Sequence, residues 1–279
     1  SAEAHGIKEE PREQESAVAT YSATVPEVRV RWSVGDAWAA EARAARGFLA
    51  RPIDVIEGNG SRGSDPELTK NYQLGTAYAS RQLTFGADVY YIDFSNLIAQ
   101  TQVATGNGNE TAYVNGGGAI YKGVEAEATF ALTHDLSLYG NASYNKATYK
   151  GSDVQVAGTP KVTAALGLLY SASSGYFGSL MGKFLGHQYG VDNTAGKTGQ
   201  PVFHNDNRIG GYFSVDAAAG YRTDHGPAGT KGYSISVDVN NLFNVHKITG
   251  YAGTQSVGGA PLYFGLPGRG VFLDLSVKL

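Results

Sequence analysis

The residues that could hold a metal or perform thiol chemistry are few and widely spaced. The six histidines stand at His5, His134, His187, His204, His225 and His246, without the close pairing of a metal-binding motif. The sequence contains no cysteine, which excludes thiolate ligands, thiol nucleophiles and disulfide bonds. Glycine-rich stretches at 116–118 and 265–270 lack the Gly-Lys-Ser/Thr sequence of a phosphate-binding loop. We therefore expect neither a metal site nor a cofactor.

Two short motifs match the signature of penicillin-recognising serine enzymes. Ser143 and Lys146 have the Ser-x-x-Lys spacing, and residues 197–199 read Lys-Thr-Gly. In those enzymes the serine begins a helix and the Lys-Thr-Gly lies on a strand. Here Ser143 lies in a run of alternating apolar and polar residues, and residues 197–199 lie in a polar stretch. We therefore expect the protein not to be an enzyme.

The other polar residues of interest form two groups. The first group occupies polar positions inside alternating runs and consists of Arg31, Glu41, Arg43, Asp88, Glu125, Glu127, Lys183, Asp216 and Asp238. The second group lies in long connections, where aromatic and basic side chains could meet a ligand, and consists of Tyr189, His204, Arg208, Tyr251, Tyr263 and Arg269. These residue types suggest binding rather than bond chemistry.

Alternation of apolar and polar residues dominates the chain and predicts strands with one apolar and one polar face. Clear runs occupy 28–34, 83–91, 123–132, 136–145, 162–170, 213–221, 233–240 and 271–279, and weaker ones occupy 37–46, 67–78 and 176–187. The sequence therefore predicts about eleven strands. A transmembrane helix is excluded, because no stretch approaches 18 consecutive apolar residues.

Short and long connections alternate between these runs. The short ones lie near 35–36, 79–82, 133–135 and 171–175, and the long ones near 47–66, 95–117, 188–211 and 243–269. An antiparallel meander then places all long loops at one end, as outer-membrane barrels do. Many runs reach ten residues, whereas strands of soluble proteins centre on about five or six. A soluble β-sandwich or lipocalin-like barrel is the alternative.

We predict an all-β fold, an antiparallel up-and-down transmembrane β-barrel that is partial, with about 11–12 strands. Residues 25–279 would form it, and residues 1–24 would be a polar N-terminal segment or the remnant of an external loop.

The net charge of −3 argues against nucleic acid as a partner. Tyrosines near strand ends predict aromatic girdles at the two membrane interfaces: Tyr72, Tyr78, Tyr91, Tyr113, Tyr144, Tyr149, Tyr170, Tyr176, Tyr212, Tyr221 and Tyr233.

Six segments resemble the carboxyl-terminal half of the barrel of TonB-dependent outer-membrane receptors, in that family's order. They are Arg46-Gly47-Phe48 with Pro52; Pro66-Glu67 with Asn71-Tyr72-Gln73-Leu74-Gly75; Tyr90-Tyr91-Ile92-Asp93-Phe94-Ser95-Asn96; Lys122-Gly123-Val124-Glu125; Gly158-Thr159-Pro160-Lys161; and Asn240-Asn241-Leu242-Phe243-Asn244. Two positions depart from the family's pattern. Gln73 replaces the usual Glu, and Leu279 stands where such barrels often end in Phe.

The resemblance implies a receptor in the Gram-negative outer membrane that imports a scarce ligand, most often a ferric siderophore. It implies lipid contact for the apolar faces and a lumen-facing position for the first group of polar residues. Contact with the TonB complex would occur only through a plug domain, which we do not find in this sequence. Siderophore chelates are commonly anionic and aromatic, which suits the Arg and Tyr residues of the second group. Two alternatives stay open: an autonomous small outer-membrane pore, with 14–24 as an extra strand, and a soluble β-rich binding module.

Overall fold

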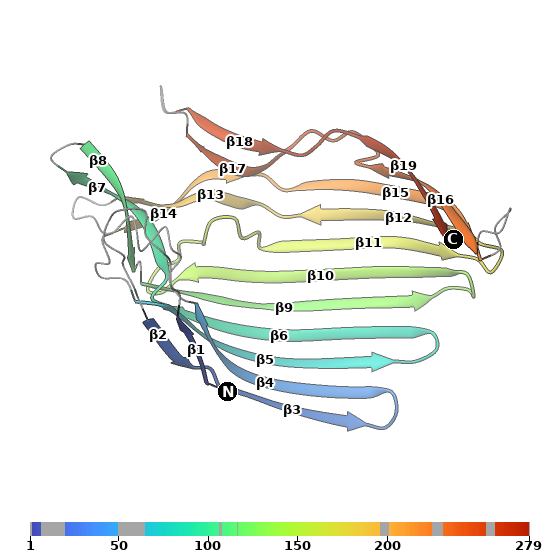
Figure 1. Ribbon diagram of the computed structural model, residues 1–279, viewed down its shortest axis with the longest axis horizontal. Helices are drawn as coiled ribbons and strands as arrows, with labels where there is room; N and C mark the ends of the chain where they lie inside the picture. Colours follow the sequence, from blue (N-terminus) through green and yellow to red (C-terminus); the bar gives the residue numbers. More distant parts are fainter. Residues whose placement is uncertain are drawn as a thin grey trace.

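Eleven strands form one antiparallel sheet in which each strand pairs with the next along the chain (Figure 1). The computed structural model describes residues 2–6, 20–49, 65–105, 108–115, 117–195, 201–224, 231–254 and 260–278. The sheet contains β3 (Glu27–Val34), β4 (Trp38–Leu49), β5 (Glu67–Ala79), β6 (Leu83–Ser95), β9 (Gly118–Ala131), β10 (Leu136–Tyr149), β11 (Val162–Ser171), β12 (Tyr176–Leu185), β15 (Tyr212–Thr223), β16 (Gly232–Asn240) and β19 (Gly270–Lys278). The predicted all-β meander of eleven strands is therefore confirmed. Over the described residues we find no helix able to cross a membrane.

Tight turns join the strands at one end of the sheet, the short-turn end. Gly35 has a φ of 64° in the turn between β3 and β4, a left-handed conformation that glycine adopts without steric cost. In the turn between β9 and β10, Thr133 Oγ1 accepts the backbone N–H groups of Asp135 (3.2 Å) and Leu136 (3.1 Å). These compact turns keep neighbouring strands in a fixed antiparallel register.

Two-stranded hairpins extend from the opposite end, the hairpin end (Figure 1). β7 (Ile98–Thr105) pairs with β8 (Gly108–Asn115), β13 (Gln188–Ala195) with β14 (Pro201–Ile209), and β17 (Ile248–Thr254) with β18 (Pro261–Gly265). The alternation of short and long connections predicted from the sequence is thus present. The long ones contain ordered strands that the sequence did not predict.

The strand register places apolar side chains on one face of the sheet. One row crosses seven strands and consists of Val30, Ala42, Leu74, Val89, Val124, Tyr144 and Val162. Leu74 is 55% exposed and Leu166, on the same face of β11, is 62% exposed. No second sheet covers this apolar face over the described residues. The soluble sandwich alternative is therefore wrong, because it would bury these rows between two layers.

Aromatic side chains border the apolar face at both ends of the strands. The ring centroids of Trp38 and Tyr78 are 4.7 Å apart at the short-turn end. Those of Tyr72 and Tyr91 are 6.5 Å apart toward the hairpin end. This arrangement is typical of the girdles that flank the apolar band of a membrane barrel.

Two of the predicted girdle tyrosines point to the polar face of the sheet instead of the apolar face. Tyr149 and Tyr212 occupy polar-face positions in the register. The ring of Tyr149 stacks on Phe203 of β14, with centroids 3.8 Å apart, and is 5% exposed. Their girdle assignment was therefore wrong, because a tyrosine near a strand end can equally anchor a loop. The side chain of Tyr113 lies outside the described residues.

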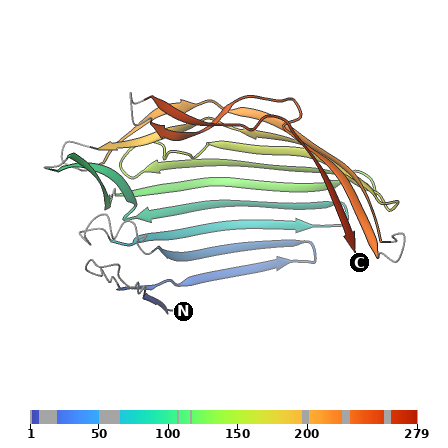
Figure 2. The same cartoon turned by 45° about the horizontal axis from the view of Figure 1, so that its top comes forward.

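The outermost strands of the sheet, β3 and β19, run in the same direction, because ten antiparallel pairings separate them. Figure 2 shows that the sheet is curved, with the orange and red strands β16 and β19 turned away from the plane of the blue strands. β2 (Thr20–Thr24) pairs with β1 (Ala2–Gly6) in a separate hairpin. Within the described residues, β2 therefore does not extend the large sheet, as the small-pore hypothesis had supposed.

Candidate functional site

The nine ionisable residues of the alternating runs share the face opposite the apolar rows, here called the polar wall. They are Arg31, Glu41, Arg43, Asp88, Glu125, Glu127, Lys183, Asp216 and Asp238. Five of them, on β3, β4, β6 and β9, border a hollow of about 620 Å³. Whether this wall faces the interior of a closed barrel stays a prediction.

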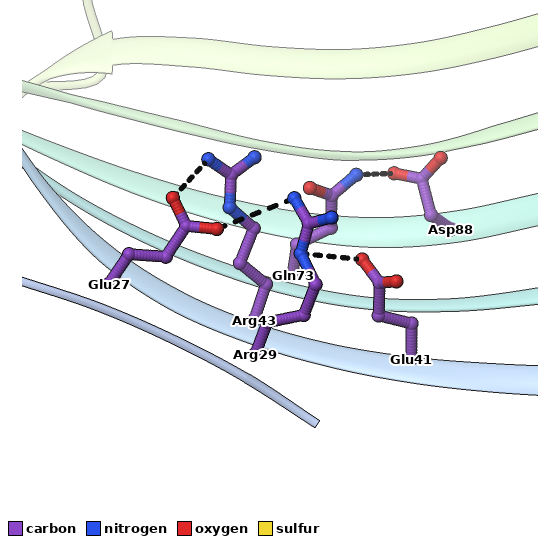
Figure 3. A network of polar contacts seen from close by, with 6 residues as sticks. All are labelled: Glu27, Arg29, Glu41, Arg43, Gln73 and Asp88. Atoms are coloured by element: carbon purple, nitrogen blue, oxygen red, sulfur yellow. Dashed lines mark hydrogen bonds and ion pairs between the residues drawn. The ribbon is translucent and has the colours of Figure 1, made fainter. Parts of the chain in front are cut away.

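Ion pairs between β3 and β4 form a network on the polar wall near the hairpin end (Figure 3). Arg43 Nη2 lies 2.9 Å from Glu27 Oε2, and Arg29 Nη2 lies 3.4 Å from Glu27 Oε1. Arg29 Nε also lies 3.4 Å from Glu41 Oε1. All four side chains are partly solvent-accessible, so each pair contributes little to stability. The network instead fixes the directions in which these charges point.

A second set of contacts joins β5 to β6 and β6 to β10. Gln73 Nε2 donates to Asp88 Oδ2 at 3.0 Å, and Tyr90 Oη donates to Asn145 Oδ1 at 3.0 Å. The ring of Tyr90 crosses directly above Gly123, where an added Cβ would lie 2.6 Å from Tyr90 Oη. Glycine at 123 therefore permits a contact that spans from β6 to β10.

The charge around the hollow is mainly negative. Asp88, Glu125 and Glu127 line it from β6 and β9, and Glu41 from β4, with Arg31 the guanidinium among its lining residues. Glu125 and Glu127 have no cation within 4 Å among the residues the structure describes. Glycine and alanine at neighbouring positions, including Gly75 and Ala77, leave the space open. The hollow can therefore accept a positively charged group without first breaking an ion pair.

A junction near the carboxyl-terminal strands uses Asp216, Lys183 and Asn241. Lys183 Nζ is paired with Asp216 Oδ2 (2.5 Å), whose other oxygen accepts the N–H of Asn241 (2.8 Å). The buried Asn241 side chain donates to the carbonyls of Val245 and Pro267 (2.9 Å each) and accepts the Val245 N–H (2.8 Å). These bonds attach both ends of the β17–β18 hairpin to the wall. Asn241 therefore anchors the β17–β18 hairpin, whereas the sequence indicated it only as part of the motif at 240–244.

Two tyrosines of the predicted ligand group come together on the β17–β18 hairpin. Tyr251 and Tyr263 lie opposite each other on β17 and β18, with ring centroids 5.9 Å apart. Tyr251 packs against β13, where a Cβ at Gly190 would lie 2.5 Å from its own Cβ, and Tyr189 is the next residue. Tyr263 Oη also donates to Asn207 Oδ1 at 3.3 Å. The structure thus assembles a tyrosine cluster of Tyr251 and Tyr263, whereas Tyr189 points to the other face of β13, where its ring lies 6.3 Å from that of His187.

The other predicted ligand residues occupy different surroundings. Arg208 lies across from Tyr189 in the β13–β14 hairpin and is exposed. His204 Nε2 pairs with Asp206 Oδ2 at 2.9 Å, and its Nδ1 lies 3.0 Å from the carbonyl of Val202. Arg269 lies away from the cluster, at the base of the last hairpin, where its N–H donates to Asn244 Oδ1 at 2.9 Å. Of the six predicted ligand residues, the structure therefore brings together Tyr251 and Tyr263; Arg208 stays with Tyr189 in the β13–β14 hairpin, and Arg269 lies in the junction.

The loop at 150–160 contacts the β13–β14 hairpin. Asn205 of β14 accepts the Gln155 N–H (2.9 Å) and donates to the Gln155 carbonyl (2.7 Å). The Gly158 N–H donates to the carbonyl of Tyr189 at 2.9 Å. These contacts fix β13 and β14 relative to the sheet, and no sequence signal indicated them. Among the described residues, we find no group of acidic or histidine side chains arranged to bind a metal ion.

The comparison with protein families gives a single consistent answer. The sequence profile described as "TonB dependent receptor-like, beta-barrel" matches residues 7–242. The ferrichrome outer membrane transporter/phage receptor of Escherichia coli (strain K12) is 29% identical over 183 residues, covering 64% of this chain and 23% of that protein. The ferrioxamine B receptor of Salmonella typhimurium (strain SL1344) is 30% identical over 198 residues, covering 68% of this chain and 26% of that protein.

Solved structures share the fold. The copper transporter OprC superposes with a TM-score of 0.73 at 18% identity, over 92% of this chain and 40% of that one. The ferric citrate transporter FecA superposes with a TM-score of 0.68 at 22% identity, over 94% of this chain and 39% of that one. The chain thus spans about a quarter of the curated relatives and two fifths of the solved ones. It belongs to the TonB-dependent receptor family and forms part of the β-barrel that this family places in the Gram-negative outer membrane.

Proposed function

We propose that this chain is the carboxyl-terminal barrel part of a receptor that imports a ferric siderophore. The observation that supports this most is the similarity to two receptors named for ferrichrome and ferrioxamine B. The Tyr251–Tyr263 pair supplies aromatic rings, and the exposed Arg208 of the β13–β14 hairpin supplies a guanidinium at the same end of the sheet; both side-chain types suit an anionic aromatic chelate. The hairpin end would be external, since long loops of such barrels face outward. The chain would contribute binding and a passage, and no bond-making step.

The polar wall would hold the plug domain of the complete receptor. Glu125 and Glu127 border a hollow and have no cation partner among the described residues, so a basic plug surface could dock there. Energy delivered through TonB would then move the plug against a wall that stays fixed. Gln73, which replaces the family's usual Glu, removes one carboxylate from this surface and instead bonds Asp88.

Iron uptake by a receptor-deficient Gram-negative strain tests the proposal when the strain carries a complete receptor, plug domain included, that has this chain as its carboxyl-terminal barrel part. Radioactive iron would be supplied as ferrichrome, ferrioxamine B or ferric citrate in separate experiments. We expect TonB-dependent uptake of ferrichrome or ferrioxamine B. Replacing Tyr251 and Tyr263 with alanine should weaken uptake at limiting ligand by about tenfold, while replacing Tyr176 at the short-turn end should not. Uptake of none of the three chelates would contradict the proposed ligand class.

The autonomous pore is less well supported by the geometry. An antiparallel barrel closes only with an even number of strands, and the large sheet has eleven. Because β3 and β19 run in the same direction, joining them directly would create a parallel seam. The extra strand that would repair this is not available from β2, which pairs with β1. Single-channel conductance from the purified chain alone would overturn this reasoning.

A further inference from the structure

One face of the β13–β14 hairpin lies against the β17–β18 hairpin (Figure 1). Gln188 and Gly190 are two residues apart on β13, so they face the same side of the strand. Gln188 is 6% exposed, and Gly190 meets Tyr251 of β17. On β14, Asn207 lies beside Gly190, and its Oδ1 accepts the hydroxyl of Tyr263 at 3.3 Å. The tyrosine cluster therefore rests on the β13–β14 hairpin.

Two β-bulges shape the segment of β17 that carries Tyr251. The pairing of β17 with β18 shifts once on each side of this residue. Such bulges bend a strand and re-aim its side chains. Thr249 is the extra residue of the first bulge, and its carbonyl accepts a hydrogen bond from Gln188 Nε2 at 2.7 Å. The buried side chain of Gln188 therefore holds β17 at the bulge that precedes Tyr251.

Glycine at 190 allows β17 to approach β13 this closely. A Cβ there would lie 2.5 Å from Tyr251 Cβ, 3.0 Å from Tyr251 Cγ and 3.3 Å from Asn207 Cβ. Carbon atoms in contact are about 3.5–4.0 Å apart, so a side chain at 190 would displace Tyr251 by about 1 Å. Binding groups must be held to within about 0.5 Å of their productive geometry. The absence of a side chain at 190 is therefore a requirement for the observed position of Tyr251.

Displacing Tyr251 would alter both rings of the cluster. Tyr251 and Tyr263 face each other in the register, with ring centroids 5.9 Å apart and ring planes 68° apart. Edge-to-face pairs of this kind prefer a defined geometry. Tyr263 is held at the same time by Asn207 of β14. A shift of β17 away from β13 would therefore change the ring pair and strain the bond to Asn207.

We propose that Gln188 and Gly190 are positioning residues that set the orientation of Tyr251 and Tyr263 toward the imported chelate. Gln188 acts through the carbonyl of Thr249, and Gly190 acts by leaving room for Tyr251. Neither residue touches the ligand itself. This inference rests on the proposed function, because it deepens the role of the tyrosine cluster.

Uptake kinetics test the proposal in a complete receptor that has this chain as its carboxyl-terminal barrel part. The chelate is ferrichrome or ferrioxamine B, whichever the unmodified receptor imports. We expect Gly190→Val to raise the concentration for half-maximal uptake by about tenfold without lowering the maximal rate. Gln188→Met, which removes the bond to Thr249, should raise it by about threefold. The matched control Gly210→Val, where a Cβ would meet nothing within 4 Å, should leave it unchanged.

A receptor without the two tyrosines separates positioning from general damage. In the Tyr251→Ala/Tyr263→Ala background, Gly190→Val should weaken uptake by less than about twofold, because the groups that it misplaces are gone. A further tenfold loss in that background would overturn the proposal. An equal loss for Gly190→Val and Gly210→Val in the unmodified background would overturn it as well.

A second measurement needs no ligand. Limited proteolysis of the purified receptor between 255 and 259 reports whether the β17–β18 hairpin has left β13. We expect faster cleavage of Gly190→Val and Gln188→Met than of Gly210→Val and the unmodified receptor, with unchanged heat-dependent gel mobility. If neither chelate is imported, the proposed function fails, whereas equal cleavage of all four proteins would overturn the present inference. Should Gly190→Val fail to fold, Gln188→Met undergoes the same tests.

Discussion

Replacing Asn241 with alanine should release the last external hairpin from the barrel wall. The side chain of Asn241 makes three hydrogen bonds, two to the N–H and carbonyl of Val245 and one to the carbonyl of Pro267. Its backbone has a φ of 52°, in the left-handed region that asparagine tolerates and alanine does not. The hydrogen bonds and the backbone conformation contribute separately to the free energy of unfolding that the substitution is expected to remove.

The magnitude follows from counting these interactions. Three net hydrogen bonds at about 1 kcal/mol each give about 3 kcal/mol for Asn241→Gly, which keeps the backbone conformation accessible. Asn241→Ala adds about 1 kcal/mol for the left-handed backbone, for a total of about 4 kcal/mol. Asn241→Asp retains the acceptor for the Val245 N–H, but it places a buried carboxylate against two carbonyl oxygens and close to Asp216, so we expect it to lose more stability than Asn241→Gly. The order of the three variants is therefore the diagnostic result.

Urea unfolding of the purified protein in detergent micelles, followed by far-ultraviolet circular dichroism, measures the global effect. Limited proteolysis between 255 and 259 measures whether the hairpin detaches locally before the sheet unfolds. We expect both readings to show the smallest loss of stability for the glycine variant, with larger losses for alanine and aspartate. Asn241→Gly with unchanged stability and unchanged protease resistance would refute the assigned role of this side chain.

Three further predictions use the same unfolding assay. Gly123→Ala should destabilise the barrel by about 1–3 kcal/mol, because the new Cβ would meet backbone on the next strand at 2.2 Å, and Tyr90→Phe should not rescue it. Asp216→Ala should cost about 1 kcal/mol more than Asp216→Asn, because asparagine still accepts the backbone N–H. A double-mutant cycle between Tyr149 and Phe203 should return a coupling of about 1 kcal/mol from their stacked rings; zero coupling would show that their contact is incidental.

The strands were predictable because the two faces of the sheet meet different solvents. Strict alternation over 83–91 and 162–170 reflects apolar side chains on one face and polar or small ones on the other. The same period fixed which side each ionisable residue takes, so Asp88 and Glu125 were correctly placed on one face. Strand ends were harder, because β4 continues to Leu49, beyond the predicted 46.

The hairpins and the hydrogen bond between β6 and β10 could not be predicted from the sequence, for two physical reasons. The sequences of 98–105 and 108–115 have polar residues at both odd and even positions, so they show no amphipathic period. The bond from Tyr90 to Asn145 joins residues 55 positions apart, and only the register of three strands brings them together. The same is true of Lys122 and Lys146, whose pairing is invisible until the register is known.

The polar wall carries its charges unevenly around the circumference. The three arginines of β3 and β4 on this wall, Arg29, Arg31 and Arg43, exceed the two glutamates there, Glu27 and Glu41, by one, whereas Asp88 and the two glutamates of β9 contribute three negative charges two to three strands from β4. This separation gives the wall a transverse dipole, and a charged body enclosed by it would have one preferred rotation about the membrane normal. Rotating such a body away from this orientation would bring like charges together. The charge distribution of the wall would therefore favour one rotational orientation of the enclosed body.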